Sequence, residues 1–158
     1  MKKLFIYTGP VRSGKSSRLL SFVQNKKDVC GILSPVIDGK KYLYDISSRE
    51  RRLLEADSQD KEADIAAIGK YKFKKKVFDW GRDVLKKAST QNHTYLIIDE
   101  IGQLEFKGKG FSPTVDVILI NNNSSIPQII VVVRDRLVNQ FLEHYKLNLE
   151  NIEFFNFD

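Results

Sequence analysis

Residues 9–16 constrain the fold of this chain more than any other segment. They read Gly-Pro-Val-Arg-Ser-Gly-Lys-Ser, with two glycines, a lysine and a serine at the fixed positions of the pattern G-x-x-x-x-G-K-[ST]. Glycine lets backbone N–H groups turn inward without a clash at Cβ, so such a segment forms a concave site for anions. The apolar segment Leu4–Thr8 precedes it, and a helix is expected from Lys15. The sequence therefore predicts a phosphate-binding loop, or P-loop, between a buried strand and a helix.

The chemistry of phosphate binding explains the residue types in this loop. Lys15 can reach the β- and γ-phosphates of a nucleoside triphosphate, and the hydroxyl of Ser16 can ligate Mg²⁺. A glycine turn with an exposed lysine is the simpler alternative, but the flanking strand and helix favour the P-loop. The predicted nucleotide-binding residues are contiguous: Gly9, Pro10, Val11, Arg12, Ser13, Gly14, Lys15, Ser16 and Ser17.

A second chemical motif follows an apolar segment later in the chain. Tyr95–Ile98 predicts a buried strand, and Asp99 and Glu100 come directly after it. Ligands of α/β sheets bind beyond the carboxyl ends of the strands. We predict that Ser16 and Asp99 hold Mg²⁺, the carboxylate through water, and that Glu100 polarises the attacking water. Many strands simply end in acidic residues, but the P-loop in the same chain favours catalysis, with Glu100 and Lys15 as the catalytic residues.

The remaining pattern predicts an α/β fold with a mostly parallel sheet. Apolar strands alternate with amphipathic helices, an arrangement in which helices cover both faces of a sheet. Asp38-Gly39 is typical of a hairpin turn, which adds an antiparallel piece. The expected strands span residues 4–8, 29–37, 42–46, 71–73, 95–98, 129–133 and 152–155, and the expected helices begin at residue 15 or span residues 78–88, 112–120 and 135–145. Residues 47–69 are charged and receive no assignment.

Composition limits the class of protein further. The length predicts a single domain over residues 1–158, and ten Phe with six Tyr argue against a disordered chain. One cysteine, Cys30, and two histidines make a disulfide framework or a zinc site improbable. The N-terminal apolar segment stops at Gly9-Pro10, short of a signal sequence, and no apolar segment has transmembrane length. We therefore expect a cytoplasmic protein without a membrane partner.

Basic residues outside the loop are weaker candidates. Arg12, Arg134 and Arg136 could each act in cis as an arginine finger on the γ-phosphate, although a surface arginine is the simpler interpretation of each. Residues 70–76 interleave lysines with aromatic residues, as segments that bind single-stranded nucleic acid do. The net charge of +6 fits an anionic partner and also fits a need for solubility. A strand with one lysine face in solvent explains the segment as well, and we favour that interpretation.

Two segments resemble a known family. Asp99–Glu105 reads Asp-Glu-Ile-Gly-Gln-Leu-Glu, close to the signature Asp-Glu-Ile-Gly-Lys-Met-Glu of the THEP1-type nucleoside-triphosphatases. Ile68–Tyr71 is similar to the Val-Gly-Lys-Tyr segment of that family, and the resemblance spans residues 4–133. Glu105 matches the last acidic residue of the signature and has no assigned role.

This resemblance implies both a fold and an activity. The fold is the three-layer fold of P-loop NTPases, with a mostly parallel, RecA-like sheet. The activity is Mg²⁺-dependent hydrolysis of nucleoside triphosphates, ATP and GTP among them, to nucleoside diphosphate and phosphate with broad base tolerance. The roles carry over to four positions of this chain: Lys15, Ser16, Asp99 and Glu100.

Two other functions stay open. The same loop serves phosphoryl transfer to a small-molecule acceptor, and residues 47–62, with Arg49, Arg51 and Arg52, could form the lid of such a kinase. The lysine-rich segment could instead belong to a nucleotide-dependent module that binds nucleic acid. Phosphate release without an acceptor would support the hydrolase, dependence on an added hydroxyl compound the kinase, and stimulation by nucleic acid the third function.

Overall fold

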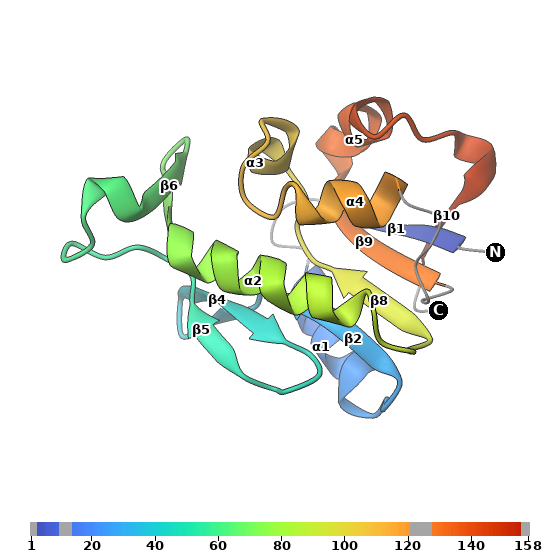
Figure 1. Ribbon diagram of the computed structural model, residues 1–158, viewed down its shortest axis with the longest axis horizontal. Coiled ribbons are helices and arrows are strands. Elements are labelled where there is room, and N and C mark those ends of the chain that lie inside the picture. Colours follow the sequence, from blue (N-terminus) through green and yellow to red (C-terminus); the bar gives the residue numbers. More distant parts are fainter. Residues whose placement is uncertain (1–2, 10–13, 121–127, 156–158) are drawn as a thin grey trace.

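The computed structural model of the protein describes residues 3–9, 14–120 and 128–155 (Figure 1). Its helices are α1 (Lys15–Gln24), α2 (Lys75–Ala88), α3 (Gln103–Phe106), α4 (Thr114–Ile120) and α5 (Val138–His144), with the 3₁₀ helices η1 (Glu62–Asp64), η2 (Asp135–Leu137) and η3 (Leu149–Asn151). Its strands are β1 (Lys3–Gly9), β2 (Val29–Leu33), β3 (Val36–Ile37), β4 (Lys40–Asp45), β5 (Arg51–Leu53), β6 (Ile65–Ile68), β7 (Tyr71–Lys74), β8 (Tyr95–Ile98), β9 (Gln128–Arg134) and β10 (Ile152–Phe154).

Among the described residues, eight strands form the main sheet in the order β10-β1-β9-β8-β2-β4-β3, with β5 paired to β4. The first five strands in this order run parallel to one another. The strands β3, β4 and β5 are antiparallel additions beside β2. The predicted α/β fold, a mostly parallel RecA-like sheet with an added hairpin, is confirmed. Since β9 lies between β1 and β8, the two chemical motifs follow strands that are separated by one strand.

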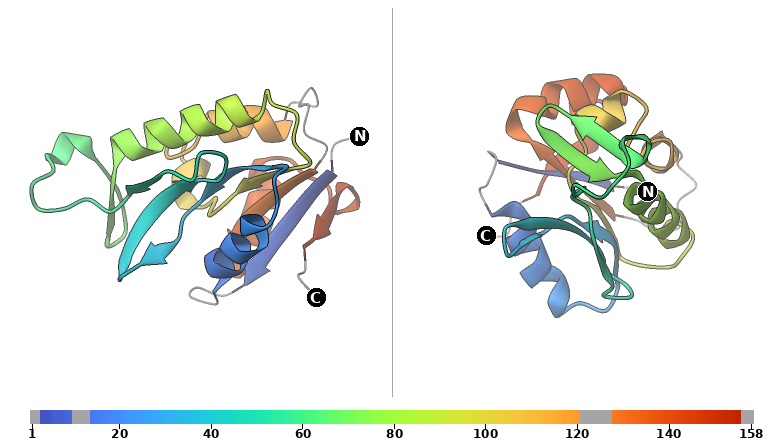
Figure 2. Two further views of the ribbon diagram at one scale, coloured as in Figure 1. Left: turned by 90° about the horizontal axis from the view of Figure 1, so that it is seen from below. Right: turned by 90° about the vertical axis from the view of Figure 1, so that its left-hand side faces the viewer.

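Helices cover both faces of the sheet, which gives three layers (Figure 2). Successive residues of a strand point to opposite faces, and β8 shows the consequence. Ile97 packs in a cluster with Leu19 of α1. Leu96, on the opposite face, packs in a larger cluster to which α2, α4 and α5 contribute buried side chains such as Phe141. Burial on both faces explains the continuous apolar strands of the sequence. Truncation of a buried Leu or Phe to Ala in such a core costs about 2–5 kcal/mol.

A two-stranded sheet projects near the N-terminal end of α2 (Figure 1). Its strands, β6 and β7, pair antiparallel. Tyr71 stacks on Phe73 with ring centroids 6.2 Å apart, and Phe73 meets Phe78 of α2 edge-on at 5.9 Å. These aromatic contacts connect the small sheet to the core. The short strand predicted at residues 71–73 is thus confirmed, and the unassigned residues 47–69 contain β5, η1 and β6.

The strand predicted over residues 29–37 is interrupted. β2 ends at Leu33, and the chain returns to the sheet only as β3. Pro35 has no N–H for a neighbouring strand, and the N–H of Ser34 donates to the side chain of Asp99 (2.8 Å). The contact with an acidic residue far away in sequence therefore ends the strand.

Several helix boundaries also differ from prediction. α2 begins at Lys75 rather than Phe78, so Lys75 and Lys76 belong to a helix and not to a lysine-faced strand. The helix predicted from residue 135 starts as the 3₁₀ turn η2 before α5, and the helix predicted from residue 112 starts at Thr114. The helix α3 was not predicted, because four residues are too short to show a helical period.

Candidate functional site

The P-loop residues that the structure describes lie where β1 ends and α1 begins. Gly14 has a φ of 81°, in the left-handed region that favours glycine. Lys15 is only 9% exposed, and its Nζ donates a hydrogen bond to the carbonyl oxygen of Gly9 (3.2 Å). Burial lowers the pKa of Lys15, while the charges of Glu100 and Asp99 oppose that effect. Four predicted residues lie outside the described residues: Pro10, Val11, Arg12 and Ser13.

Asp99 lies fully buried immediately after β8. Its Oδ2 accepts hydrogen bonds from Ser16 Oγ (2.7 Å) and from the N–H of Ser34 (2.8 Å), whereas its Oδ1 is buried without a hydrogen-bond partner in the described part of the chain. Burial, followed by the negative charge of Glu100, raises the pKa of Asp99. An unpaired buried carboxylate oxygen calls for an explanation, and oxygen ligands are those that Mg²⁺ prefers. The predicted metal ligands are therefore in contact, and they fit a magnesium ion.

Glu100 has a backbone conformation that is rare for a residue with a side chain. Its φ is 60°, which for a residue other than glycine costs about 1–3 kcal/mol. The N–H groups of the residues before and after it donate to the carbonyl oxygens of Ile32 (3.2 Å) and Val132 (3.1 Å). The hydrogen bonds to β2 and β9 thus hold the chain in this turn. The Glu100 carboxylate forms an ion pair with Lys41 of β4.

A cleft of about 750 Å³ joins these residues to the antiparallel part of the molecule. Lys15, Ser16 and Glu100 belong to its polar lining. The lining also includes apolar residues from the small sheet, α2, α3 and neighbouring loops, among them Leu54, Ile68, Tyr71, Phe73, Phe78, Leu104 and Phe111. The volume lies in the range of about 300–1,000 Å³ that is typical of small-molecule sites.

Two of the three arginine-finger candidates line this cleft. Arg134, the last residue of β9, pairs in register with Gly9 of β1, so its side chain starts beside the phosphate loop. Arg136 follows in η2 and lines the same cleft. Arg12 lies outside the described residues.

The arginines of the predicted lid point to other partners. Arg51 lies over the ring of Tyr42 at 5.1 Å, and Arg52 lies over the ring of Trp80 at 4.3 Å. Within the described chain, neither these two nor Arg49 belongs to the lining of the cleft. The geometry therefore gives the lid hypothesis no support.

Two lysines of the lysine-rich segment, residues 70–76, contact residues of the preceding segment 57–63. Lys74 forms ion pairs with Asp60 (3.8 Å) and Asp57 (4.0 Å). Lys75 donates to the carbonyl oxygen of Ala63 (2.9 Å). Because β7 ends at Lys74, the segment is divided between a strand and a helix and does not form one lysine-faced strand.

Glu105 organises the loop after Glu100. It is 3% exposed, and its Oε1 and Oε2 accept hydrogen bonds from the N–H groups of Gly102 (2.8 Å) and Phe111 (3.0 Å). Burial raises the pKa of Glu105 to about 7. A Cβ at Gly110 would lie 1.9 Å from Oε2 of Glu105, so this close approach requires glycine. The acidic residue without an assigned role therefore closes a loop that lines the cleft.

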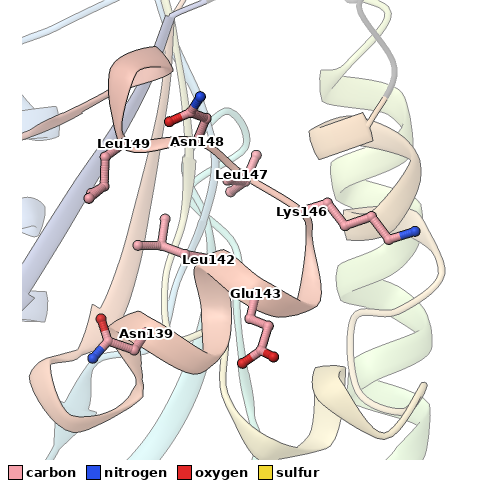
Figure 3. Close-up of a pocket in the computed structure, with 7 residues that line it drawn as sticks. All are labelled: Asn139, Leu142, Glu143, Lys146, Leu147, Asn148 and Leu149. Atoms are coloured by element: carbon pink, nitrogen blue, oxygen red, sulfur yellow. The ribbon is translucent and has the colours of Figure 1, made fainter.

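A second hollow, of about 500 Å³, has a different lining (Figure 3). Its residues come from α5, η3 and the segment between them: Asn139, Leu142, Glu143, Lys146, Leu147, Asn148 and Leu149. None of the predicted site residues that the structure describes is among them. In the described part of the chain, no helix combines the length and the apolar character needed to cross a membrane.

The strand order, with a P-loop after β1 and an acidic pair after β8, defines the class of P-loop NTPases. The chain belongs to the NTPase family, whose sequence model matches residues 3–158. This membership makes the protein a nucleoside-triphosphatase, as the resemblance implied. The chain matches no curated protein sequence.

Two solved structures are similar to this chain. One is a crystal structure of THEP1 from the hyperthermophile Aquifex aeolicus, with a TM-score of 0.73 and 17% identity over 97% of this chain and 88% of that chain. The other is a solution structure of a human cancer-related nucleoside triphosphatase, with a TM-score of 0.61 and 20% identity over 99% of this chain and 88% of that chain. At these identities the two structures support the P-loop fold.

Sequence reasoning missed two contributions to the site and gave a third residue no role. Ser34 contributes only a backbone N–H, which no side-chain pattern can reveal. The ion pair of Lys41 with Glu100 depends on the pairing of β4 with β3. The only local indication of that pairing is the Asp38-Gly39 turn between the two strands. Glu105 was noticed in the family signature, but its role depends on the fold of residues 102–111.

Proposed function

We propose that this nucleoside-triphosphatase hydrolyses ATP, GTP and other nucleoside triphosphates to the diphosphate and phosphate with Mg²⁺. The proposal includes a single domain over residues 1–158 and a cytoplasmic location. The observation that carries it is the 2.7 Å contact between Ser16 and Asp99, because it brings together one residue from each of the two motifs that we expect to bind the metal.

In this proposal, residues 9–17 bind the triphosphate. Their backbone N–H groups bind phosphate oxygens, and Lys15 neutralises the charge of the β- and γ-phosphates. Ser16 and Asp99 hold the magnesium ion, which supplies positive charge to the phosphate oxygens when it is bound. Base tolerance follows, since none of these contacts involves the base.

Glu100 acts as the general base. It accepts a proton from water as the water oxygen bonds to the γ-phosphorus and the bond from that phosphorus to the β,γ-bridging oxygen breaks. The diphosphate takes the electron pair of that bond, and phosphate leaves with the added oxygen. Arg134 is the best-placed side chain to stabilise the charge that develops on the γ-phosphate, because it starts beside Gly9.

Phosphoryl transfer to an acceptor is the second candidate function. One observation favours it: the cleft that Glu100 lines is also lined by the aromatic residues Tyr71, Phe73 and Phe78. Hydrolysis alone does not require these aromatic residues. A kinase would use them to hold an acceptor in place of water.

Phosphate release from ATP, GTP, CTP and UTP, each with and without Mg²⁺, tests the proposal. We expect release from all four nucleotides only with Mg²⁺, without any added acceptor. Asp99→Asn should raise the Mg²⁺ concentration needed for half-maximal activity, because a neutral amide is a weaker ligand for this cation. Exposed Asp57, changed to Asn, serves as the control. Absence of release with any nucleotide would contradict the hydrolase, and release only with a hydroxyl acceptor would favour the kinase.

A further inference from the structure

Two lysines approach the same pair of carboxylates from different parts of the chain. Lys15 comes from α1, and the charges of Glu100 and Asp99 act on it. Lys41 comes from β4, where its ammonium group forms the ion pair with Glu100 and its charge acts on Asp99. Both lysines line the cleft. The P-loop motif explains Lys15, whereas no motif includes Lys41.

The backbone of Lys41 is held on both edges of β4. Its N–H donates to the carboxylate of Glu55 (3.1 Å), and its carbonyl oxygen accepts from the N–H of Leu54 (2.9 Å). In the sheet it pairs with Val36 of β3. Its side chain is 15% exposed. The strand thus fixes where the side chain begins, and the flexible four-carbon stem leaves the ammonium group able to change partners.

The ion pair competes with the role proposed for Glu100. The ammonium group of Lys41 takes up an acceptor position on Oε2 of the Glu100 carboxylate, where a water molecule would otherwise donate. A nucleoside triphosphate in the P-loop would bring its terminal phosphate between Lys15 and Glu100. That group carries more negative charge and more acceptor oxygens than one carboxylate, and lysine binds phosphate as a point charge.

We propose that Lys41 is a second phosphate-binding lysine, which exchanges its contact with Glu100 for the terminal phosphate when a triphosphate binds. The move frees Glu100 to orient the attacking water. This inference rests on the proposed function. A diphosphate lacks the terminal phosphate, so Lys41 discriminates substrate from product.

Lys40 and Lys41 are neighbours in β4 and provide a matched pair of variants. Lys40 carries the same charge but lies exposed, outside the lining of the cleft in the described chain. Binding of a non-hydrolysable ATP analogue and of ADP, each with Mg²⁺, is measured by calorimetry for Lys41→Ala and Lys40→Ala. Lys41→Ala should bind the analogue roughly 10- to 100-fold more weakly, the scale of a hydrogen bond to a charged group, and ADP within about twofold. Lys40→Ala should change neither affinity.

Turnover gives a second readout. The kcat of Lys41→Ala should fall by about 10²-fold or more, the scale for loss of one donor to a charge that develops in the transition state. Lys41→Arg should restore the preference for the triphosphate, because it keeps the charge. Thermal unfolding checks that Lys41→Ala folds, and Lys41→Gln, which keeps most of the side-chain length, replaces it otherwise.

A variant of Glu100 separates the two partners of Lys41. In Glu100→Gln the lysine loses its charged partner, so the analogue should bind more tightly than to the unmodified protein. That gain in affinity should disappear in the double variant that combines Glu100→Gln with Lys41→Ala, which would show that the two residues are energetically coupled. If Lys41→Ala lowers kcat while the ratio of analogue to ADP affinity stays unchanged, Lys41 merely positions Glu100 and the proposal is overturned. If the unmodified protein binds no triphosphate, the proposed function fails and this inference fails with it.

Discussion

The molecule has a parallel part, the parallel strands with helix α1, and an antiparallel part, the strands β3 to β7 of the two sheets. The two parts bring residues to the cleft in different ways. In the parallel part, Gly9, Asp99 and Arg134 lie at the carboxyl ends of β1, β8 and β9, so strand order alone brings them together. In the antiparallel part, Lys41 and Tyr71 lie on hairpin strands. Their positions depend on turns and on which strand pairs with which.

This difference indicates that one part of the molecule carries the chemistry and the other the selectivity. The parallel part holds every described residue to which we assign a role in binding phosphate, metal or water, except Lys41. The antiparallel part supplies much of the remaining lining, which is largely apolar. We therefore expect changes in the parallel part to abolish turnover, and changes in the antiparallel part to alter selectivity or to have little effect.

The largest effect should come from Lys15→Ala in the parallel part. The β- and γ-phosphates lose their point charge, so turnover should be abolished and nucleotide binding weakened. Phosphate release and calorimetric binding measure the two effects. Arg18→Ala, an exposed position of the same helix, is the control and should behave like the unmodified protein. Normal turnover by a folded Lys15→Ala protein would remove the P-loop assignment.

Glu100→Gln should separate binding from chemistry within the parallel part. The amide cannot accept the proton of water, so turnover should fall by roughly 10²-fold or more, while Mg²⁺-dependent ATP binding is retained or becomes tighter. The comparison of binding with single-turnover hydrolysis in the same variant supplies its own control. Hydrolysis at the normal rate would show that another group is the base.

The same contrast explains how much the sequence could predict. Lys15, Ser16, Asp99 and Glu100 belong to short contiguous motifs next to apolar strands, so local patterns sufficed to choose them and to predict the parallel sheet. The end of β2 at Leu33 depends on a hydrogen bond between Ser34 and Asp99, which no local pattern contains. The ion pair of Lys41 likewise depends on the register of β4. Long-range pairing decides such features, and a single sequence does not show it.

The loop closed by Glu105 should affect stability more than chemistry. At pH 5 the buried Glu105 is protonated, and its hydroxyl oxygen can still accept from an N–H group. In Glu105→Gln the N–H group of Gly102 or Phe111 would face an NH₂ donor that cannot accept, so we expect a loss of about 1–3 kcal/mol of unfolding free energy at pH 5. Urea unfolding measures it, with exposed Glu143→Gln as the control. An unchanged midpoint would contradict the role of Glu105 in the loop.

The pH dependence of that loss has a definite sign. Burial raises the pKa of Glu105 from 4.5 to about 7 in the folded state, so the fold favours the protonated form. Its contribution to stability is present below pH 4.5 and is lost as the pH rises through 7. The stability difference between the unmodified protein and Glu105→Gln should therefore narrow between pH 5 and pH 8. A difference that widens would show that the hydrogen bonds to the carboxylate outweigh its burial.

The smallest effect should come from the lysines of β7 and of the start of α2. Changing Lys72, Lys74, Lys75 and Lys76 to Gln should leave turnover nearly intact, because none of the four belongs to the lining of the cleft in the described chain. Added nucleic acid should change neither the turnover of the unmodified protein nor that of the fourfold variant. A groove for single strands would instead give binding with steep salt dependence, and each lost phosphate contact would reduce the log–log slope by about 0.7. We expect no such binding, because Lys74 and Lys75 already have partners within the region. Salt-sensitive binding that disappears in the fourfold variant, together with turnover stimulated by nucleic acid, would show that the antiparallel part selects nucleic acid and not a small molecule.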